Sequence, residues 1–332
     1  MFHSYINFNT LLLVVISLNF FLFYKYKIIS NIFNLIDHIK NNRKINKKKG
    51  FLVGGIFFFI NIFLFFVVDF FYNLEIFNLK NHELFYFFLT FLFLFILGVY
   101  DDKYDLSPFK KLFFLFFIFY FLVTFDDSIR ITELRFNIIS RTINLELFSK
   151  FITIFFLLMF LNAFNMFDGI NLQCGIYSFL VILFFLLFIG KLEIYYFILL
   201  FLIFFLYWNY KSNVFLGNSG SLLLPFIISY YFIKLYNNKN IFFVEEIYIY
   251  MCIPGLDMFR LFVIRILKKK NPFRGDLLHI HHLILKKDGY FYSLLLIQFL
   301  VFLTIISGYL ISFQFAIFIS LFVYLGLLLK YN

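Results

Sequence analysis

The sequence predicts an all-α polytopic membrane protein with about eleven transmembrane helices. Of its 332 residues, 63% are hydrophobic and 26% are aromatic, and the mean hydropathy is +0.93. A soluble domain cannot hide so much apolar surface. Apolar runs long enough to cross a bilayer also recur along the whole chain. Because no linker, tandem repeat or low-complexity tail interrupts them, residues 1–332 are expected to form a single transmembrane domain.

The apolar runs set the expected helices. They fall near residues 8–24, 51–71, 84–100, 112–125, 151–166, 176–190, 194–209, 219–236, 245–266, 291–309 and 313–330. The segment between the fourth and fifth runs, residues 126–150, carries alternating apolar residues that predict a small β-hairpin: Ile131, Leu134, Phe136 and Ile138.

Lysine and arginine set the expected orientation. One set of alternate loops holds twenty of them and the other set holds eight. Basic loops stay in the cytoplasm, so the N-terminus is expected outside, the C-terminus in the cytoplasm and the 126–150 segment outside. Orientation accounts for much of the net charge of +11, and no nucleic-acid partner is expected.

With this orientation, four polar loops face the cytoplasm, and they are expected to share a site. They cover residues 101–111, 162–171, 215–221 and 265–290. The first contains Asp101 and Asp102 directly after an apolar run. Two adjacent carboxylates repel each other beside low-dielectric material unless a cation accompanies them. The stretch is therefore either a solvated helix end with its counter-charges or a divalent-metal or acid/base site at a membrane surface.

The second and third loops offer oxygen ligands and backbone donors. Asn162, Asn165 and Asp168 follow one stripe of a helix end, and Gly169 lets the chain turn. They form either an ordinary capped terminus or a group of ligands suited to Mg²⁺. Residues 215–221 begin a helix, whose N-terminal N–H groups favour a phosphate. An ordinary Asn or Ser cap is the alternative.

The fourth loop concentrates basic side chains. Three histidines, His279, His281 and His282, follow a series of arginines. Zinc is one interpretation, but no cysteine or clustered carboxylate completes a tetrahedral set. Hydrogen bonds to phosphate oxygens, with charge from the arginines, fit better. These arginines are Arg260, Arg265 and Arg274.

Together these loops resemble the polyprenyl-phosphate N-acetylhexosamine-1-phosphate transferases of glycosyltransferase family 4, over nearly the whole chain. The resemblance is carried by Arg43-Lys44 with Gly54-Gly55, Gly98…Asp101-Asp102…Leu106, Asn162…Asn165…Asp168-Gly169, Phe215-Leu216-Gly217…Gly220-Ser221 and Asp257…Arg260…Arg265…Pro272-Phe273…Asp276…His279-Ile280-His281-His282.

The resemblance implies an enzyme that transfers a sugar-1-phosphate from a UDP-N-acetylhexosamine to undecaprenyl (polyprenyl) phosphate and releases UMP, with Mg²⁺ or alternatively Mn²⁺. It implies the first membrane step of a surface polysaccharide such as the lipopolysaccharide O-antigen, in a bacterial inner membrane with the site facing the cytoplasm. A homodimer is a further expectation. The His-x-His-His form resembles the UDP-N-acetylglucosamine branch more than the UDP-MurNAc-pentapeptide branch.

The resemblance also implies a role for individual residues. Asp101, Asp102 and Asp168 are expected to be catalytic, and Asp102, Asn165 and Asn218 are expected to hold the metal ion. Substrate binding is expected of the remaining set: Lys48, Asn171, Arg260, Arg265, Arg274, Asp276, His279, His281 and His282.

The chain departs from the family pattern at several positions. Asn218 and Asn171 stand where the family usually has Asp, and Asn46 and Phe51 replace a usual His and Pro. Losing a charged ligand should weaken Mg²⁺ binding. A catalytically weakened member that binds lipid phosphate is therefore one alternative. A transporter is the other, although Asp69, Asp257 and Arg260 fall toward helix ends rather than the bilayer midplane.

Overall fold

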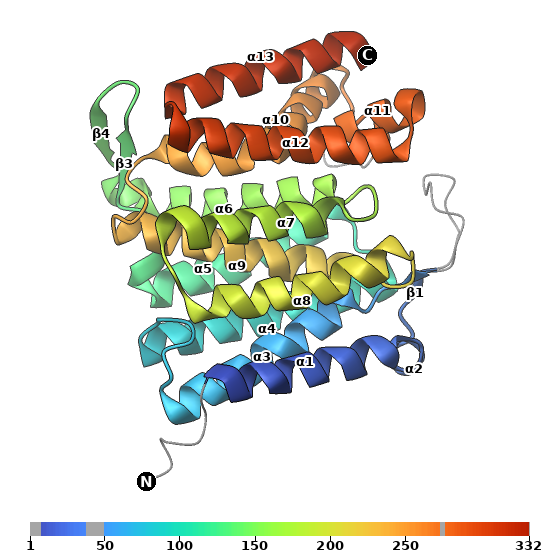
Figure 1. Ribbon diagram of the computed structural model, residues 1–332. Coiled ribbons are helices and arrows are strands. Elements are labelled where there is room, and N and C mark those ends of the chain that lie inside the picture. The colour runs from blue at the N-terminus through green and yellow to red at the C-terminus, as the bar shows by residue number, and fades with distance from the viewer. Residues whose placement is uncertain (1–7, 38–49, 273–275, 332) are drawn as a thin grey trace. The chain divides into compact units, whose positions relative to one another are not determined.

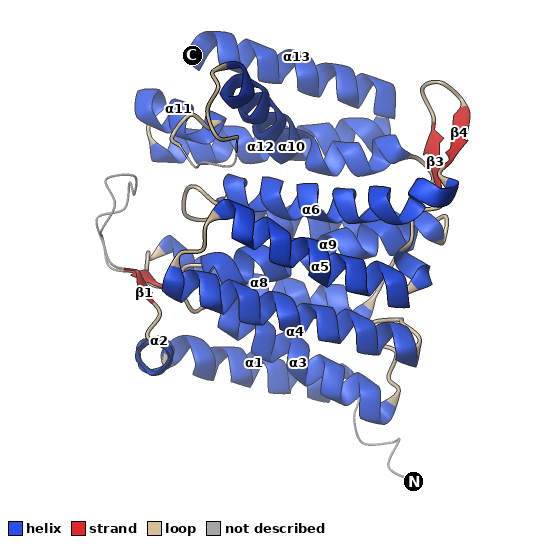
Figure 2. Ribbon diagram, turned by 180° about the vertical axis from the view of Figure 1, so that it is seen from behind, coloured by secondary structure: helices blue, strands red, loops and turns tan. Residues whose placement is uncertain are grey.

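The computed structural model describes residues 8–37, 50–272 and 276–331, and helices dominate them (Figures 1 and 2). This confirms the predicted all-α class. The helices are α1 Phe8–Tyr24, α2 Tyr26–Phe33, α3 Gly54–Tyr72, α4 Asn81–Tyr104, α5 Pro108–Phe125, α6 Ser149–Phe167, α7 Gln173–Phe184, α8 Glu193–Tyr210, α9 Gly217–Asn237, α10 Val244–Leu267, α11 Ile280–Asp288, α12 Tyr290–Leu310 and α13 Phe313–Tyr331. Short single-turn helices are η1 Asp127–Ile129, η2 Glu146–Phe148 and η3 Phe185–Ile189, and the strands are β1 Ile36–Asp37, β2 Gly50–Phe51, β3 Glu133–Phe136 and β4 Arg141–Asn144.

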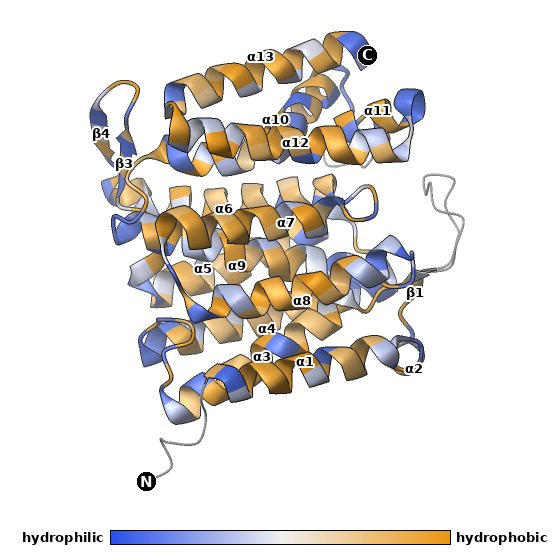
Figure 3. Ribbon diagram, viewed as in Figure 1, coloured by the Kyte–Doolittle hydropathy of each residue, from blue (hydrophilic) through white to orange (hydrophobic). Residues whose placement is uncertain are grey.

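Within the described residues, nine helices are long and apolar enough to cross a membrane. Figure 3 shows that apolar residues predominate along these helices. Two predicted spans differ. The first, α1, is followed at once by α2 at a bend of 68°, so the pair is either a broken span or a re-entrant loop. The predicted 176–190 span is a shorter apolar helix, Gln173–Ile189, which ends in the π-helical turn η3.

Local sequence explains where several helices begin and end. At the start of α4, the Glu83 carboxylate accepts the Lys80 backbone N–H at 3.0 Å, which satisfies one donor at the terminus. The same helix ends at Tyr104, and the next residue, Asp105, adopts a left-handed backbone conformation with a φ of 51°. Pro108 then opens α5, where its missing N–H costs nothing.

The chain divides into two compact units: unit 1 contains residues 1–106 and 178–224, and unit 2 contains residues 107–177 and 225–332. The prediction of one continuous domain stays a prediction. In unit 1, a reciprocal amide pair lies within an aromatic core. Asn19 of α1 and Asn61 of α3 are buried, and their side chains exchange hydrogen bonds of 2.8 and 3.1 Å. Such pairs join helices where water is absent.

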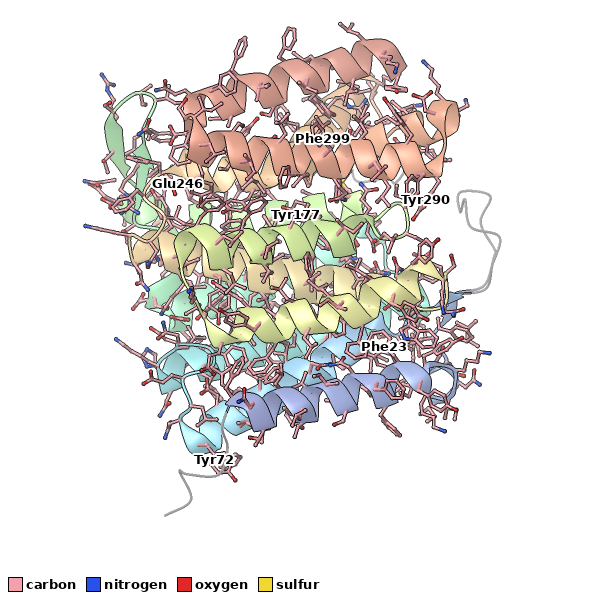
Figure 4. All side chains as sticks on the ribbon, in the orientation of Figure 1. Phe23, Tyr72, Tyr177, Glu246, Tyr290 and Phe299 are labelled. Atoms are coloured by element: carbon pink, nitrogen blue, oxygen red, sulfur yellow. The ribbon has the colours of Figure 1, made fainter. Side chains whose placement is uncertain are left out.

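In unit 2, α10 packs against α6, α12 and α13. Buried tyrosines hydrogen-bond within this core: the Tyr177 hydroxyl, labelled in Figure 4, donates to the Tyr250 carbonyl at 2.9 Å. The predicted hairpin is also here, because β3 and β4 pair antiparallel with Leu134 opposite Ile143.

Candidate functional site

In unit 1, α3 and α4 approach the start of α9 so closely that there is no room for a side chain at the contact positions. A Cβ on Gly98 of α4 would lie 2.3 Å from the Ser219 Cα, and a Cβ on Gly55 of α3 would lie 2.2 Å from the Gly220 backbone nitrogen. Both distances are far below normal contact. Only glycine therefore lets α3 and α4 approach the start of α9 so closely, and this approach positions Asp102.

Asp102 binds the first turn of α9. Its Oδ1 accepts the Asn218 N–H at 2.7 Å, and its Oδ2 accepts the Ser219 N–H and the Ser219 hydroxyl, both at 3.1 Å. This is a helix N-cap supplied by another helix. Gly217, at φ 71°, leaves room for the carboxylate, because a Cβ there would lie 2.8 Å from Oδ2. The Asp102 carboxylate therefore binds the N–H groups at the start of α9 for which the sequence suggested a phosphate or an ordinary cap.

Asp101 has a different environment. It is buried, and its Oδ1 accepts the Leu106 N–H at 2.8 Å, so it also fixes the loop after α4. The structure therefore brings Asp101, Asp102 and Asn218 together, as the motifs predicted, and assigns both carboxylates a structural contact. Their predicted catalytic and metal-binding roles stay predictions.

In unit 2, the centre is the buried carboxylate of Asp257, on α10. Its Oδ1 accepts hydrogen bonds from Arg260 at 2.9 Å, from the Ile280 N–H at 3.1 Å and from the Tyr324 hydroxyl at 2.9 Å. Its Oδ2 lies 2.7 Å from His279 Nδ1. An ionised carboxylate only accepts, so Nδ1 carries a hydrogen and donates it to Asp257. The imidazole is thereby held in one orientation.

Two of the predicted arginines, Arg260 and Arg265, lie in α10 and have partners within unit 2. Arg260 donates from Nε to the Tyr324 hydroxyl at 3.0 Å and also binds the Leu278 carbonyl at 2.6 Å. Arg265 donates from Nε to Asp276 at 3.0 Å and from one terminal nitrogen to the Pro272 carbonyl at 2.8 Å. Burial acts to raise the pKa of Asp276, but the hydrogen bonds from Arg265 and Leu278 outweigh it and hold that pKa below its usual value.

One donor of Arg265 remains for another group. Its second terminal nitrogen is buried and finds no hydrogen-bond partner among the described residues. A buried unpaired donor on a cation is costly, which makes it a candidate contact for an anion. The interaction with substrate predicted for Arg265 can therefore involve this single nitrogen while the rest of the guanidinium holds Asp276.

His281 and His282 lie beside His279, with ring centroids of His281 and His282 4.2 Å apart. Burial lowers the pKa of His281 well below its usual value and that of His282 to about 4, and the neighbouring histidines add to both effects. Both rings are therefore neutral at pH 7. Neutral imidazoles bind phosphate through hydrogen bonds rather than charge, which is the role that the sequence analysis expected of these histidines, with the positive charge supplied by arginines.

The 168–171 turn lies directly on His281. A Cβ on Gly169 would lie 2.0 Å from His281 Nε2, so only glycine fits between the end of α6 and the ring. The turn is also tied to α12, because the Tyr290 hydroxyl donates to the Asn171 carbonyl at 3.1 Å (Figure 4). Unit 2 thus joins the predicted Asp168 loop to the predicted histidine cluster.

Two predicted substrate-binding residues, Lys48 and Arg274, lie outside the described residues, as do Arg43, Lys44, Asn46 and Phe273. Asn165, Asp168 and Asn171 lie at the end of α6 in unit 2. The prediction that these residues share one site with Asp101, Asp102 and Asn218 of unit 1 stays a prediction.

The donor types fit Mg²⁺, because carboxylate and amide oxygens are its usual protein ligands. Asp102 already accepts three hydrogen bonds from the first turn of α9. Across the described residues, no group of three or more His, Cys, Asp or Glu side chains could hold a metal ion. A metal ion here would therefore rely on amide, water or substrate oxygens as well.

Sequence reasoning did not find Tyr324 or Tyr290. Tyr324 lies within an apolar run of α13 and Tyr290 at the start of α12, so nothing in the local pattern separates them from lipid-facing tyrosines. Gly98 and Gly169 did stand in the quoted motifs, but only the structure shows which atoms their missing side chains avoid.

Comparison with known proteins agrees with the motifs. Residues 84–236 match the family model described as "Glycosyl transferase family 4". The chain is 33% identical over 220 residues to an undecaprenyl-phosphate alpha-N-acetylglucosaminyl 1-phosphate transferase of Thermotoga maritima, and that match covers 64% of this chain and 65% of the relative. A protein of the same name from Pasteurella multocida is 36% identical over 78 residues, which cover 23% of this chain and 22% of that relative.

The segment that matches the family model, residues 84–236, includes Asp101, Asp102, Asp168 and Asn218. The match with the Thermotoga relative covers somewhat less than two thirds of that relative's length. The family model and the two named relatives support the family that the motifs predicted, that of the polyprenyl-phosphate N-acetylhexosamine-1-phosphate transferases.

Proposed function

We propose that this protein transfers an N-acetylhexosamine-1-phosphate, such as GlcNAc-1-phosphate, from a UDP-sugar to a polyprenyl phosphate and releases UMP. The observation that carries the proposal is the family match over 84–236, because this segment holds three of the four polar loops. The name of the Thermotoga relative supports the acceptor and the sugar class. The UDP donor rests on the family resemblance.

The proposed chemistry needs positioning and charge neutralisation more than covalent catalysis. An oxygen of the acceptor phosphate attacks the phosphorus attached to the sugar, the bond between this phosphorus and the bridging oxygen breaks, and UMP leaves with that oxygen. Asp101 is the candidate to keep the acceptor phosphate deprotonated. Arg265, through its unpaired terminal nitrogen, is the candidate to bind the donor phosphates.

Mg²⁺ is the proposed cofactor, with Asp102, Asn218 and Asn165 as its candidate protein ligands. When bound, the ion would neutralise phosphate charge and orient the reacting oxygens. Asp102 would at the same time hold α9 in place, so its loss would affect both the ion and the helix. Because Asn218 carries no charge, we propose weaker Mg²⁺ binding than a carboxylate would give.

We propose a multi-pass enzyme of a bacterial inner membrane that uses its soluble donor from the cytoplasm. The excess of Lys and Arg in one set of loops supports this orientation. The step would begin the assembly of a lipid-linked surface polysaccharide.

The test is a membrane assay with polyprenyl phosphate and labelled UDP-GlcNAc, with and without Mg²⁺. Asp101→Asn keeps an oxygen to accept the Leu106 N–H and removes only the charge. Asp105→Asn is the matched control, because it removes a charge from the same loop at an exposed residue whose φ of 51° suits Asn. We expect Mg²⁺-dependent lipid-linked product and UMP from the native chain and Asp105→Asn, and at least about a hundredfold less from Asp101→Asn.

The second candidate function is lipid-phosphate binding by a catalytically weakened chain, which Asn218 and Asn171 favour. Asn218→Asp separates the two. Product from the native chain supports the enzyme, whereas product only from Asn218→Asp identifies a chain that binds but does not turn over. If every variant binds polyprenyl phosphate and none forms product with any UDP-N-acetylhexosamine, the proposed transfer is wrong.

A further inference from the structure

The segment between α5 and α6 carries apolar side chains that the rest of unit 2 does not cover. Ile139, in the turn of the β3–β4 hairpin, is 54% exposed, and Ile143 of β4 is 48% exposed. Leu147 and Phe148 of η2 are 94% and 71% exposed. Together with Ile138, also exposed, these five side chains are here called the apolar segment. The proposed transfer uses none of them.

The hairpin that carries the segment is firmly attached at one side. The Arg135 guanidinium lies 4.1 Å from the centre of the Tyr236 ring and donates to the Tyr236 and Phe242 carbonyls. The Tyr236 hydroxyl in turn accepts the Arg135 backbone N–H. The turn is fixed as well, because the Ile138 N–H donates to Glu245. The exposed isoleucines are therefore presented by a held structure.

The apolar segment continues into a membrane-crossing helix. The candidate span covers Glu146–Phe167, so Leu147 and Phe148 lie in its first turn. Further along this span, Phe151 and Phe155 are 60% and 51% exposed in unit 2. In a membrane protein such side chains meet lipid acyl chains. The exposed apolar surface thus runs from the span into the hairpin without interruption along the chain.

The charge of residues 126–150 does not favour binding to a charged macromolecule. Residues 126–150 hold four acidic and four basic residues, so their net charge is zero, and two of the basic ones are paired locally, Arg130 with Asp127 and Arg135 with Glu133. The segment therefore has no net charge with which to attract a strongly charged macromolecule. Hydrophobic burial remains as the driving force.

We propose that the apolar segment is a membrane-interface anchor: its side chains insert into the headgroup and upper acyl region of the bilayer that α6 crosses. Within unit 2 the segment lies at the beginning of α6, whereas Asp168 lies at its end, so the anchor acts on the membrane face opposite that loop. Figure 1 shows the hairpin extending from the beginning of α6 across the direction of the unit 2 helices, as an element lying along a membrane surface would.

The test places a nitroxide label at one position at a time in the full chain, reconstituted in vesicles of phosphatidylethanolamine and phosphatidylglycerol. Ile139→Cys and Ile143→Cys report on the segment. Thr142→Cys is the matched control, because this exposed neighbour in β4 points to the opposite side of the hairpin. The native cysteines are buried, so the unsubstituted chain gives the background labelling.

We expect molecular oxygen, which dissolves in lipid, to collide severalfold more often than a water-soluble nickel complex with labels at Ile139 and Ile143, and the reverse at Thr142. Equal access of the nickel complex at all three positions would show a water-facing hairpin and overturn the proposal. Exclusion of both reagents together with dipolar broadening would show a second copy of the chain there and would also overturn it.

A label could disturb the hairpin, so a second measurement uses tryptophan. The chain has one tryptophan, Trp208, and Trp208→Phe provides the background for Ile139→Trp and Thr142→Trp. Quenching of Ile139→Trp by lipids brominated near the headgroup, without comparable quenching of Thr142→Trp, supports the anchor. No quenching of either overturns it. Both readouts are independent of catalysis.

Discussion

Single carboxylates and glycines decide the local geometry of the motif residues in each of the two units. Asp102 accepts three hydrogen bonds from the first turn of α9, and Asp257 accepts hydrogen bonds from α10, α13 and the start of α11. Each acidic side chain therefore organises backbone and neighbouring side chains before any substrate is considered. Gly98 lets α4 approach the start of α9, and Gly169 leaves room for the His281 ring.

At Asp102, the contribution to stability can be separated from the charge of the loop. Asp102→Ala leaves the Asn218 and Ser219 donors without their carboxylate, and hydrogen bonds to a charged acceptor contribute about 1.5–3 kcal/mol. We expect a clearly lower Tm in detergent for Asp102→Ala and an unchanged Tm for Asp105→Asn, in a thermal unfolding experiment. Equal Tm values for both variants would contradict the capping role.

At Gly169, the contact with His281 predicts a coupled pair. Gly169→Ala places a Cβ 2.0 Å from the buried ring, and overpacking of this kind costs about 1–3 kcal/mol. His281→Ala removes the obstacle, so the double variant should lose less stability than the sum of the two single variants, with a coupling of about 1 kcal/mol or more. Thermal unfolding of all four proteins measures it, and strictly additive losses would exclude the contact.

At the scale of elements, buried polar pairs decide which helices dock. α1 and α3 are joined in unit 1 by Asn19 and Asn61. In unit 2, Arg135 joins the β3–β4 hairpin to the last turn of α9 and to the segment that follows it. Lipid is as apolar as the helix surfaces themselves, so hydrophobic burial alone does not select partners inside a membrane. Polar contacts and close packing supply the selection.

The amide pair makes a direct prediction for the docking of α1. Asn61→Leu leaves the Asn19 amide buried without its partner, at a cost of about 1–3 kcal/mol, whereas Asn19→Leu/Asn61→Leu removes both polar groups. We expect the single variant to unfold at lower temperature than the double variant. A double variant as unstable as the single one would show that polar pairing is not what joins these helices.

For the whole molecule, the histidine cluster predicts how stability depends on pH. The pKa of folded His282 is about 4 and that of His281 is also far below the ordinary value of 6.5, because the folded state buries both rings. The unfolded chain binds protons near pH 6.5, so it gains protons first as the pH falls. Stability is therefore retained above pH 6.5 and decreases between pH 6.5 and about 4.

This prediction is measured by thermal unfolding of the detergent-solubilised chain across that pH window. His282→Gln cannot titrate, so its Tm should fall less between pH 7 and pH 4.5 than that of the native chain. For one group with this shift the difference is at most about 3 kcal/mol, and partial exposure of His282 reduces it. An identical pH slope in the variant would exclude His282 as a source of the effect.

The sequence alone was enough to predict the fold class, the hairpin at 126–150 and the position of several motif residues at helix ends. Hydrophobic composition and run length are properties of the chain that do not depend on the partners of a helix. The sequence did not predict the bend between α1 and α2 or the shortness of the Gln173–Ile189 helix. An apolar run has the same composition whether the helix it forms is continuous, bent or interrupted.

The motifs also predicted which residue types lie at these helix ends, but not which atoms each side chain binds. Asp102 was predicted as a catalytic and metal-binding group, yet its contacts with Asn218 and Ser219 depend on a distance that only tertiary packing sets. Tyr324, which donates to Asp257, lies 67 residues further along the chain and has no local signal. The sequence determined the chemistry available at the helix ends, whereas the tertiary structure decided its partners, because hydrogen bonds select by distance and direction and periodicity carries neither.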